Sequence, residues 1–177
     1  MEETGTFILE ILKISLPALI VAGGMYMVIK KYQERDYQTR LLELRMKNTE
    51  VILPVRLQAY ERIVLFLDRI APSSLLLRVS SAGQSAAEYH RLLLSEIRSE
   101  FNHNMSQQVY MTEQAWQQVK HAREDTLNLI NKTYQELPEN AKGSELAKKV
   151  LENILAIETD PTTRAINYLK KEIAQVF

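Results

Sequence analysis

Apolar side chains recur every three or four residues along most of this chain, and that spacing constrains its fold more than any other feature. The stripes occupy residues 57–70, 89–101, 116–134, 146–155 and 165–177. Such a period places the apolar side chains on one face of an α-helix. Composition agrees, because only five Gly and five Pro interrupt a chain of 177 residues. No segment alternates apolar and polar residues as a strand does, so we predict an all-α protein.

Several helix starts can be read from the residues between these stripes. Ser85 followed by Glu88 is a capping box, in which each side chain bonds the backbone N–H group of the other residue. Thr112 is a second predicted N-cap, and Asp160 places an N-cap residue directly before Pro161 at the first helical position. The loops between the helices are short, so we predict that they pack as an antiparallel bundle.

A separate hydrophobic segment lies near the N-terminus. Residues 7–29 are mostly apolar, and Glu10 and Lys13 are their only charged residues. A helix of that length reaches roughly 34 Å, enough for the hydrocarbon core of a bilayer. We therefore expect an N-terminal transmembrane helix followed by the bundle. A cleaved signal peptide is disfavoured because the chain begins with acidic residues, and a buried helix of a soluble core is the remaining alternative.

The charges that flank this segment predict its orientation. Lys30, Lys31 and Arg35 follow it, whereas Glu2 and Glu3 precede it. By the positive-inside rule, the N-terminus lies outside and the C-terminal domain lies in the cytoplasm, as in a single-pass protein of the inner (plasma) membrane. The lipid bilayer is then an expected partner. The three basic residues either contact anionic headgroups or serve only to set the topology.

Three segments follow from this interpretation: an N-terminal transmembrane anchor (residues 1–30), a charged juxtamembrane helix (31–53) and a cytoplasmic helical bundle (54–177). Pro54 is expected to kink or restart the helix at the second boundary. Apolar residues near this boundary also have the alternating four- and three-residue spacing of a coiled-coil seam. The pattern is shorter than three heptads, so one amphipathic helix packing on its own domain is favoured. The seam residues are Tyr37, Leu41, Leu44, Asn48, Val51 and Val55.

Catalytic motifs are missing from the sequence. It has no Cys, no glycine-rich phosphate loop and no nucleophile elbow. Glu100 and His103 have the Glu-x-x-His spacing of di-iron bundles, but such sites need a second pair, which His90 and His121 do not supply. We therefore expect no catalysis, no metal and no cofactor. A formal net charge of zero, with acidic residues among the basic ones, argues against nucleic-acid binding.

A cluster of amide side chains stands at the end of the second stripe. Such amides commonly cap a helix or brace it against a neighbour, which is the simpler interpretation. Binding of a ligand or partner is the alternative. The single Trp nearby is more often a core residue than a ligand platform. The candidate interaction residues are therefore Asn102, His103, Asn104, Gln107, Gln108 and Trp116.

Two stretches carry a resemblance to a known family. The first is LQAYERI at residues 57–63 with LDRIAP at 67–72, and the second is EFNHNMSQQ at 100–108 with Trp116 after it. These motifs resemble an uncharacterised bacterial family of Bacteroidetes type, with a similar N-terminal membrane anchor and helical domain. The resemblance covers most of the chain. It implies no known activity, so no functional residue is carried over.

The function expected from these observations is that of a membrane-anchored scaffold or accessory subunit that binds a protein partner or associates with itself. One alternative is a stalk-like subunit of a larger membrane complex, although the prolines are expected to break the chain into helices too short for a stalk. The other alternative is a helical-bundle metal protein or enzyme that uses Glu100 and His103.

Overall fold

The computed structural model describes the backbone of residues 2–176 and the side chains of residues 13, 16–17, 19–37, 39–40, 42–43, 46–47 and 50–175. Over the described backbone, every named element is a helix: six α-helices and one 3₁₀-helix. The prediction of an all-α protein is therefore confirmed. The chain divides into two units, Met1–Ile52 and Leu53–Phe177.

The first helix, α1, runs over Glu2–Ile70 and belongs to both units. Of the two outcomes predicted for Pro54, a kink or a restart, the restart is wrong, because α1 continues through this residue. A proline removes one backbone donor, so the carbonyl group four residues earlier, that of Glu50, loses its helical partner. Glu50 is exposed, and water can bond that carbonyl group in place of the missing N–H.

The predicted transmembrane helix is not supported. Among the residues that the structure describes, no helix contains a stretch long and apolar enough to span a membrane. The longest uncharged stretch of α1 covers only residues 14–29, and Lys30 and Lys31 follow at once, whereas a span needs about twenty apolar residues. Extending it towards the N-terminus brings in Glu10 and Lys13. The finding contradicts three linked predictions: a fold with a membrane anchor, an inner-membrane localisation, and an orientation across that membrane.

The seam predicted at the boundary between the units is described only in part. Tyr37 and Val51 are exposed, and Val55 is 41% exposed. Three of the predicted seam positions have side chains outside the described residues: Leu41, Leu44 and Asn48.

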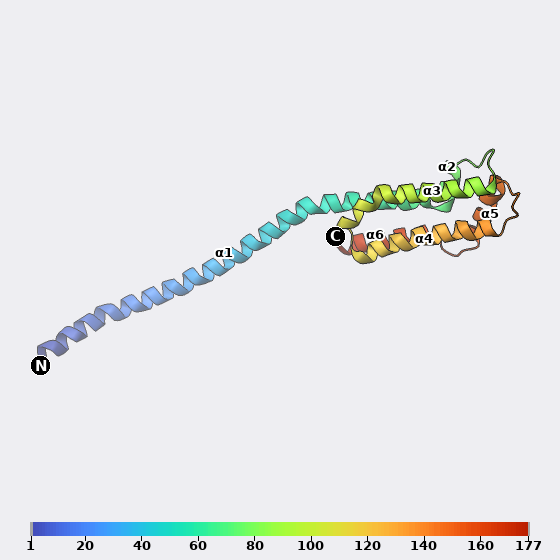
Figure 1. Ribbon diagram of the computed structural model, residues 1–177. Coiled ribbons are helices and arrows are strands. Elements are labelled where there is room, and N and C mark those ends of the chain that lie inside the picture. Colours follow the sequence, from blue (N-terminus) through green and yellow to red (C-terminus); the bar gives the residue numbers. More distant parts are fainter. Residues whose placement is uncertain (1, 177) are drawn as a thin grey trace. The chain divides into compact units, whose positions relative to one another are not determined.

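The second unit is an antiparallel helical bundle. Its long helices are the last part of α1, α3 (Ala86–Asn104), α4 (Glu113–Gln135) and α6 (Pro161–Val176). Aromatic contacts show that α3 and α4 are antiparallel. Phe101, near the end of α3, stacks on Trp116, near the start of α4, whereas His90, near the start of α3, stacks on Tyr134, near the end of α4. Figure 1 shows α3, α4 and α6 side by side, with the short helices α2 (Pro72–Arg78) and α5 (Gly143–Leu155) at one end of the bundle.

The predicted stripes supply the core. Each long helix contributes side chains that are almost completely buried, which removes apolar surface from water and stabilises the bundle. A row of aromatic rings joins three helices. The ring centroid of Phe101 in α3 lies 5.9 Å from that of Phe66 in α1 and 5.5 Å from that of Trp116 in α4. The fully buried aliphatic residues are Ile63, Leu67, Ile70, Leu75, Leu93, Ile97, Val119, Ile130, Leu146, Val150 and Leu169.

The helix starts agree with the predicted caps. Ser85 accepts a hydrogen bond from the backbone of Glu88, and Glu88 accepts one from the backbone of Ser85 at 2.9 Å. The hydroxyl group of Thr112 accepts from the backbone N–H of Ala115 at 3.1 Å, so α4 begins where predicted. Asp160 accepts from the backbone N–H group that follows Pro161, and α6 begins at this proline.

Two loops at the α2 and α5 end of the bundle are joined by backbone hydrogen bonds. The N–H of Ala86 donates to the carbonyl of Ala141, and the N–H of Gly143 donates to the carbonyl of Gln84, both at 2.9 Å. Tyr89 packs beneath this junction and donates its buried hydroxyl to the carbonyl of Val79 at 2.8 Å. These bonds fix α5 against the start of α3.

Candidate functional site

The predicted amide cluster lies where α3 ends. Asn104 is buried, and its side-chain N–H group donates to the carbonyl of Glu100 at 2.9 Å, so this amide braces the last turn of α3. Asn102 and His103 are exposed on the last turn. The structure thus divides the cluster into one bracing residue and neighbours that face solvent.

A 3₁₀-helix, η1 (Met105–Tyr110), follows directly. Its six residues exceed the usual length of a 3₁₀-helix, and none of them is buried. Gln108 is exposed, whereas Gln107 is partly buried and donates to Ser106 at 3.3 Å. At the other end, Arg56 of α1 donates to the carbonyl of Tyr110 at 3.2 Å. This bond holds η1 against α1 without burying its side chains.

A groove of about 420 Å³ lies between α1 and η1. Ala59 is 1% exposed, whereas Val55, Val109 and Tyr110 are 41%, 77% and 42% exposed. The groove therefore combines apolar side chains that face solvent with amide groups. We call it the α1–η1 groove, and it is lined by Val55, Gln58, Ala59, Arg62, Ser106, Gln107, Val109 and Tyr110.

Of the candidate residues taken from the sequence, Gln107 lines this groove. Trp116 lies apart from it, because its ring is 6% exposed and stacks on Phe101. Sequence reasoning missed Gln58, Arg62 and Val109. The one available signal was Val109, an apolar residue placed between two predicted helices rather than on a helical stripe.

Arg62 is the only charged residue among the described residues that line the α1–η1 groove. It is exposed, and within the described part of the chain no carboxylate lies at ion-pair distance from it. Arg69, two turns further along α1, differs because it pairs with Glu100. The groove therefore carries a positive charge that forms no ion pair with a described carboxylate.

Beside the groove, α1 is tied to α6. Tyr60 is 3% exposed and donates its hydroxyl to Glu172 at 2.5 Å. The second carboxylate oxygen of Glu172 is buried and has no hydrogen-bond partner among the described residues. Burial raises the pKa of Tyr60, and the hydrogen bond to Glu172 raises this pKa further. Tyr60 therefore stays neutral and acts as a structural donor between the two helices.

The Glu100 and His103 pair does not form a metal site in the described structure. Glu100 accepts a hydrogen bond from Arg69 at 2.8 Å, and Arg78 lies 3.9 Å from the same oxygen. His103 is exposed. Across the residues searched, no group of three or more His, Cys, Asp or Glu side chains is placed to hold a metal ion. Glu100 serves instead to join α1, α2 and α3.

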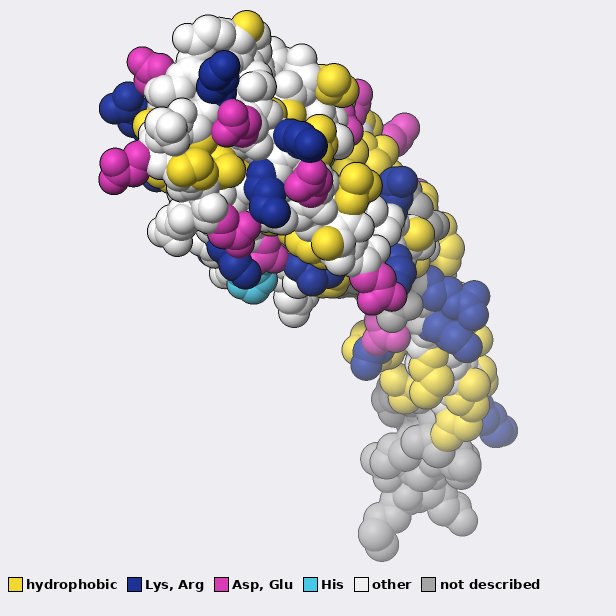
Figure 2. Space-filling view, turned by 90° about the vertical axis from the view of Figure 1, so that its right-hand side faces the viewer, with side chains coloured by type: hydrophobic (Ala, Val, Ile, Leu, Met, Phe, Trp, Pro, Cys, Tyr) yellow, Lys and Arg dark blue, Asp and Glu magenta, His cyan; other side chains and the backbone are white. Residues whose placement is uncertain are grey.

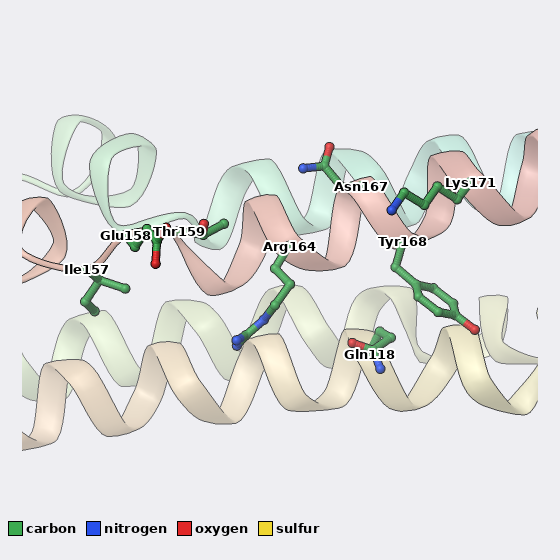
Figure 3. Close-up of a pocket in the computed structure, with 8 residues that line it drawn as sticks. All are labelled: Gln118, Ile157, Glu158, Thr159, Arg164, Asn167, Tyr168 and Lys171. Carbon is green, nitrogen blue, oxygen red and sulfur yellow. The ribbon is translucent and has the colours of Figure 1, made fainter.

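A second groove, of about 540 Å³, lies along α4 and α6 (Figure 3). Figure 3 shows the side chains of Arg164 and Tyr168 extending from α6 towards α4, where Gln118 lies. Arg164 pairs with Asp125 of α4 at 2.9 Å, and this pair neutralises its charge. The other charged residues that line the groove, Glu158 and Lys171, have opposite signs. This groove therefore offers no net charge to recognise, and its ion pair is explained by helix packing.

The surface charges are mixed elsewhere as well. In the bundle face shown in Figure 2, Lys and Arg side chains alternate with Asp and Glu side chains. Such a face lacks the continuous positive patch that binds a phosphate backbone. Lys30, Lys31 and Arg35 lie exposed on α1 in the first unit. Their predicted roles, contact with lipid headgroups or setting the topology, both required the transmembrane helix that the structure does not support.

Comparisons with known proteins identify a family. No curated protein and no solved structure matches the chain. One family model matches residues 6–176, and its description is "Family of unknown function (DUF7935)". The match confirms the expected relation to an uncharacterised family, and it includes both α1 and the bundle. The chain therefore belongs to the DUF7935 family of unknown function.

Proposed function

We propose that this protein is a non-catalytic helical interaction module that binds a segment of a partner protein in its α1–η1 groove. The observation that carries the proposal is the α1–η1 groove itself, in which Val109 is 77% exposed on a 3₁₀-helix without buried side chains. This segment connects α3 to α4 and buries none of its side chains, so its apolar residues are available to a partner. Exposed apolar residues beside polar ones are typical of interaction surfaces.

The dimensions of the groove suit a short segment rather than a whole domain. Its volume of about 420 Å³ falls in the range of binding pockets, roughly 300–1,000 Å³. Complete burial of one valine-sized side chain contributes about 1.5–3 kcal/mol. Val55 and Tyr110 are only 41% and 42% exposed, so part of their surface is already removed from water, and association carries an entropic cost. We therefore expect a weak, exchangeable complex.

The absence of Cys from the sequence permits a direct test by maleimide labelling. Val109→Cys places a thiol in the groove, and Leu77→Cys places a matched thiol on α2, where Leu77 is 89% exposed. Both variants are labelled as purified proteins and in extracts of the cells that naturally produce the protein. We expect slower labelling at position 109 in the extract and unchanged labelling at position 77.

Equal labelling rates at position 109 in both settings would contradict the proposal. Protection that arises in the purified protein as its concentration increases would instead indicate that a second copy occupies the groove. The control at position 77 detects general effects of the extract on the labelling reagent. Both substituted side chains are exposed, so loss of folding is not expected, and circular dichroism verifies this.

A further inference from the structure

We infer that the α1–η1 groove recognises a short acidic peptide segment of its partner, in which a carboxylate pairs with Arg62 and an apolar side chain packs on Val109. This inference rests on the proposed function and adds the chemistry of the partner. It follows from the charge, the amide groups and the apolar surface of the groove, taken in turn.

The charge of the groove favours a negatively charged segment. Arg62 is exposed in the groove, and no carboxylate of the described chain lies at ion-pair distance from it. Arg56, which does not line the groove, donates to the carbonyl of Tyr110 at one end of it. No acidic residue is among the described residues that line the groove. A guanidinium group binds a carboxylate through two parallel hydrogen bonds, so Arg62 is suited to an Asp or Glu side chain.

The amide groups favour a peptide over other anions. Gln58 and Gln107 line the groove from its two sides, and each amide carries both a donor and an acceptor. An extended peptide backbone presents the complementary donors and acceptors along its length. A nucleic acid would need several cations aligned with its phosphates, whereas Arg62 is the one cation in the described lining.

The apolar surface supplies the anchor. Val109 and Val55 are 77% and 41% exposed, and both line the groove near Arg62. An apolar side chain of the bound segment can cover them while a neighbouring acidic residue reaches Arg62. The recognised pattern is therefore one or more acidic residues next to a Leu, Ile, Val, Met or aromatic residue.

A displayed library of random peptides tests this pattern on the purified full-length protein. Binders are retained on the natural chain, depleted on a Val109→Ser variant, which removes the apolar contact without changing the charge of the groove, and sequenced. The tightest peptide is then labelled with a fluorophore, and its affinity is measured by fluorescence anisotropy against three variants. These are Arg62→Glu, Arg62→Gln and, as a matched control on α3, Arg98→Glu, since Arg98 is exposed and does not line the groove.

We expect the retained peptides to be enriched in Asp and Glu beside an apolar residue. Arg62→Glu should weaken binding about fivefold to tenfold, because it replaces attraction by repulsion at an exposed site. Arg62→Gln should weaken binding less, and Arg98→Glu should change it less than about twofold. A peptide with its acidic residue changed to Lys should regain affinity for Arg62→Glu.

The possible failures are distinguishable. Peptides that require Val109 but show no acidic enrichment, or that bind Arg62→Glu as well as the natural chain, overturn the inference and leave the proposed function intact. A library that yields no peptide dependent on Val109 overturns both. Thermal unfolding of each variant, followed by circular dichroism, separates a loss of binding from a loss of folding.

Discussion

Replacement of Gly143 by Ala is a sharp test of how the two loops at the end of the bundle meet. A Cβ atom at this position would lie 3.1 Å from the carbonyl oxygen of Ser81, 3.1 Å from Cβ of Tyr89 and 3.2 Å from the carbonyl oxygen of Gln84. Two of these atoms belong to the backbone and the third is next to it. No flexible side-chain end is available to move aside.

The surrounding bonds make a shift costly. The carbonyl of Gln84 already accepts the hydrogen bond of Gly143 at 2.9 Å, and Tyr89 is fully buried with its hydroxyl bonded to Val79. Overpacking of this kind costs about 1–3 kcal/mol. A gain of roughly 0.4–1 kcal/mol from the less flexible unfolded chain opposes it. We therefore expect Gly143→Ala to lower the free energy of unfolding by about 1–2 kcal/mol.

The assay is urea unfolding of the full chain, followed by circular dichroism, with thermal unfolding as a second measurement. A loss of this size lowers Tm by about 3–8 °C for a domain of this length. Ser144→Ala is the matched control, since Ser144 is exposed on the same helix, and it should change stability by less than about 0.5 kcal/mol. A Gly143→Ala variant as stable as the natural chain would refute the close approach of the loops.

Three further perturbations concern the cap, the core and the tie between α1 and α6. Ser85→Ala removes the α3 cap and should cost about 1 kcal/mol in urea unfolding, with the helix content unchanged. Leu93→Ala, at a fully buried position, should cost about 2–5 kcal/mol in the same assay, and a loss below 1 kcal/mol would contradict the described packing. Tyr60→Phe leaves the partly buried carboxylate of Glu172 without its donor and should cost about 1–3 kcal/mol near neutral pH. Because folding raises the pKa of Tyr60, its stabilising effect is complete below the unfolded value of about 10 and is lost as pH rises through the folded value. Urea unfolding between about pH 9 and 12 should therefore show a shallower alkaline loss of stability in Tyr60→Phe than in the natural chain.

The helices were predictable where their signals are local. The capping box of Ser85 and Glu88, the N-cap Thr112 and the start of α6 at Pro161 each depend on residues within one turn. Hydrogen-bonding geometry over such short distances is set by residue type and spacing. The apolar stripes also predicted which face of each helix is buried, because the helical period determines which side chains point in the same direction.

The errors arose where a local pattern was extended too far. The prediction of a span over residues 7–29 crosses Glu10 and Lys13, whereas the described chain contains no helix apolar enough to span a membrane. Pro54 does not restart the helix, because a helix can lose one backbone bond at an exposed position and continue. Proline strongly disfavours the helix interior, but neighbouring helix-forming residues can outweigh that preference.

The α1–η1 groove could not be predicted from the sequence, and the reason is different. It joins Val55 and Arg62 of α1 to Val109 of η1, and only the tertiary fold brings these distant segments together. The sequence also did not show that the helix after Asn104 changes to a 3₁₀ form. That change leaves the side chains of η1 outside the core, where they are available to a partner.

Photo-cross-linking from position 109 tests the central claim of a binding groove most directly. A benzoylphenylalanine placed at Val109 of the full-length protein is irradiated in the cells that naturally produce it, and the same residue at Leu77 is the control. We predict one discrete adduct at position 109, absent at position 77, in which mass spectrometry maps the cross-link to an acidic segment of a single partner. No adduct at position 109, or the same set of adducts at both positions, would contradict the account.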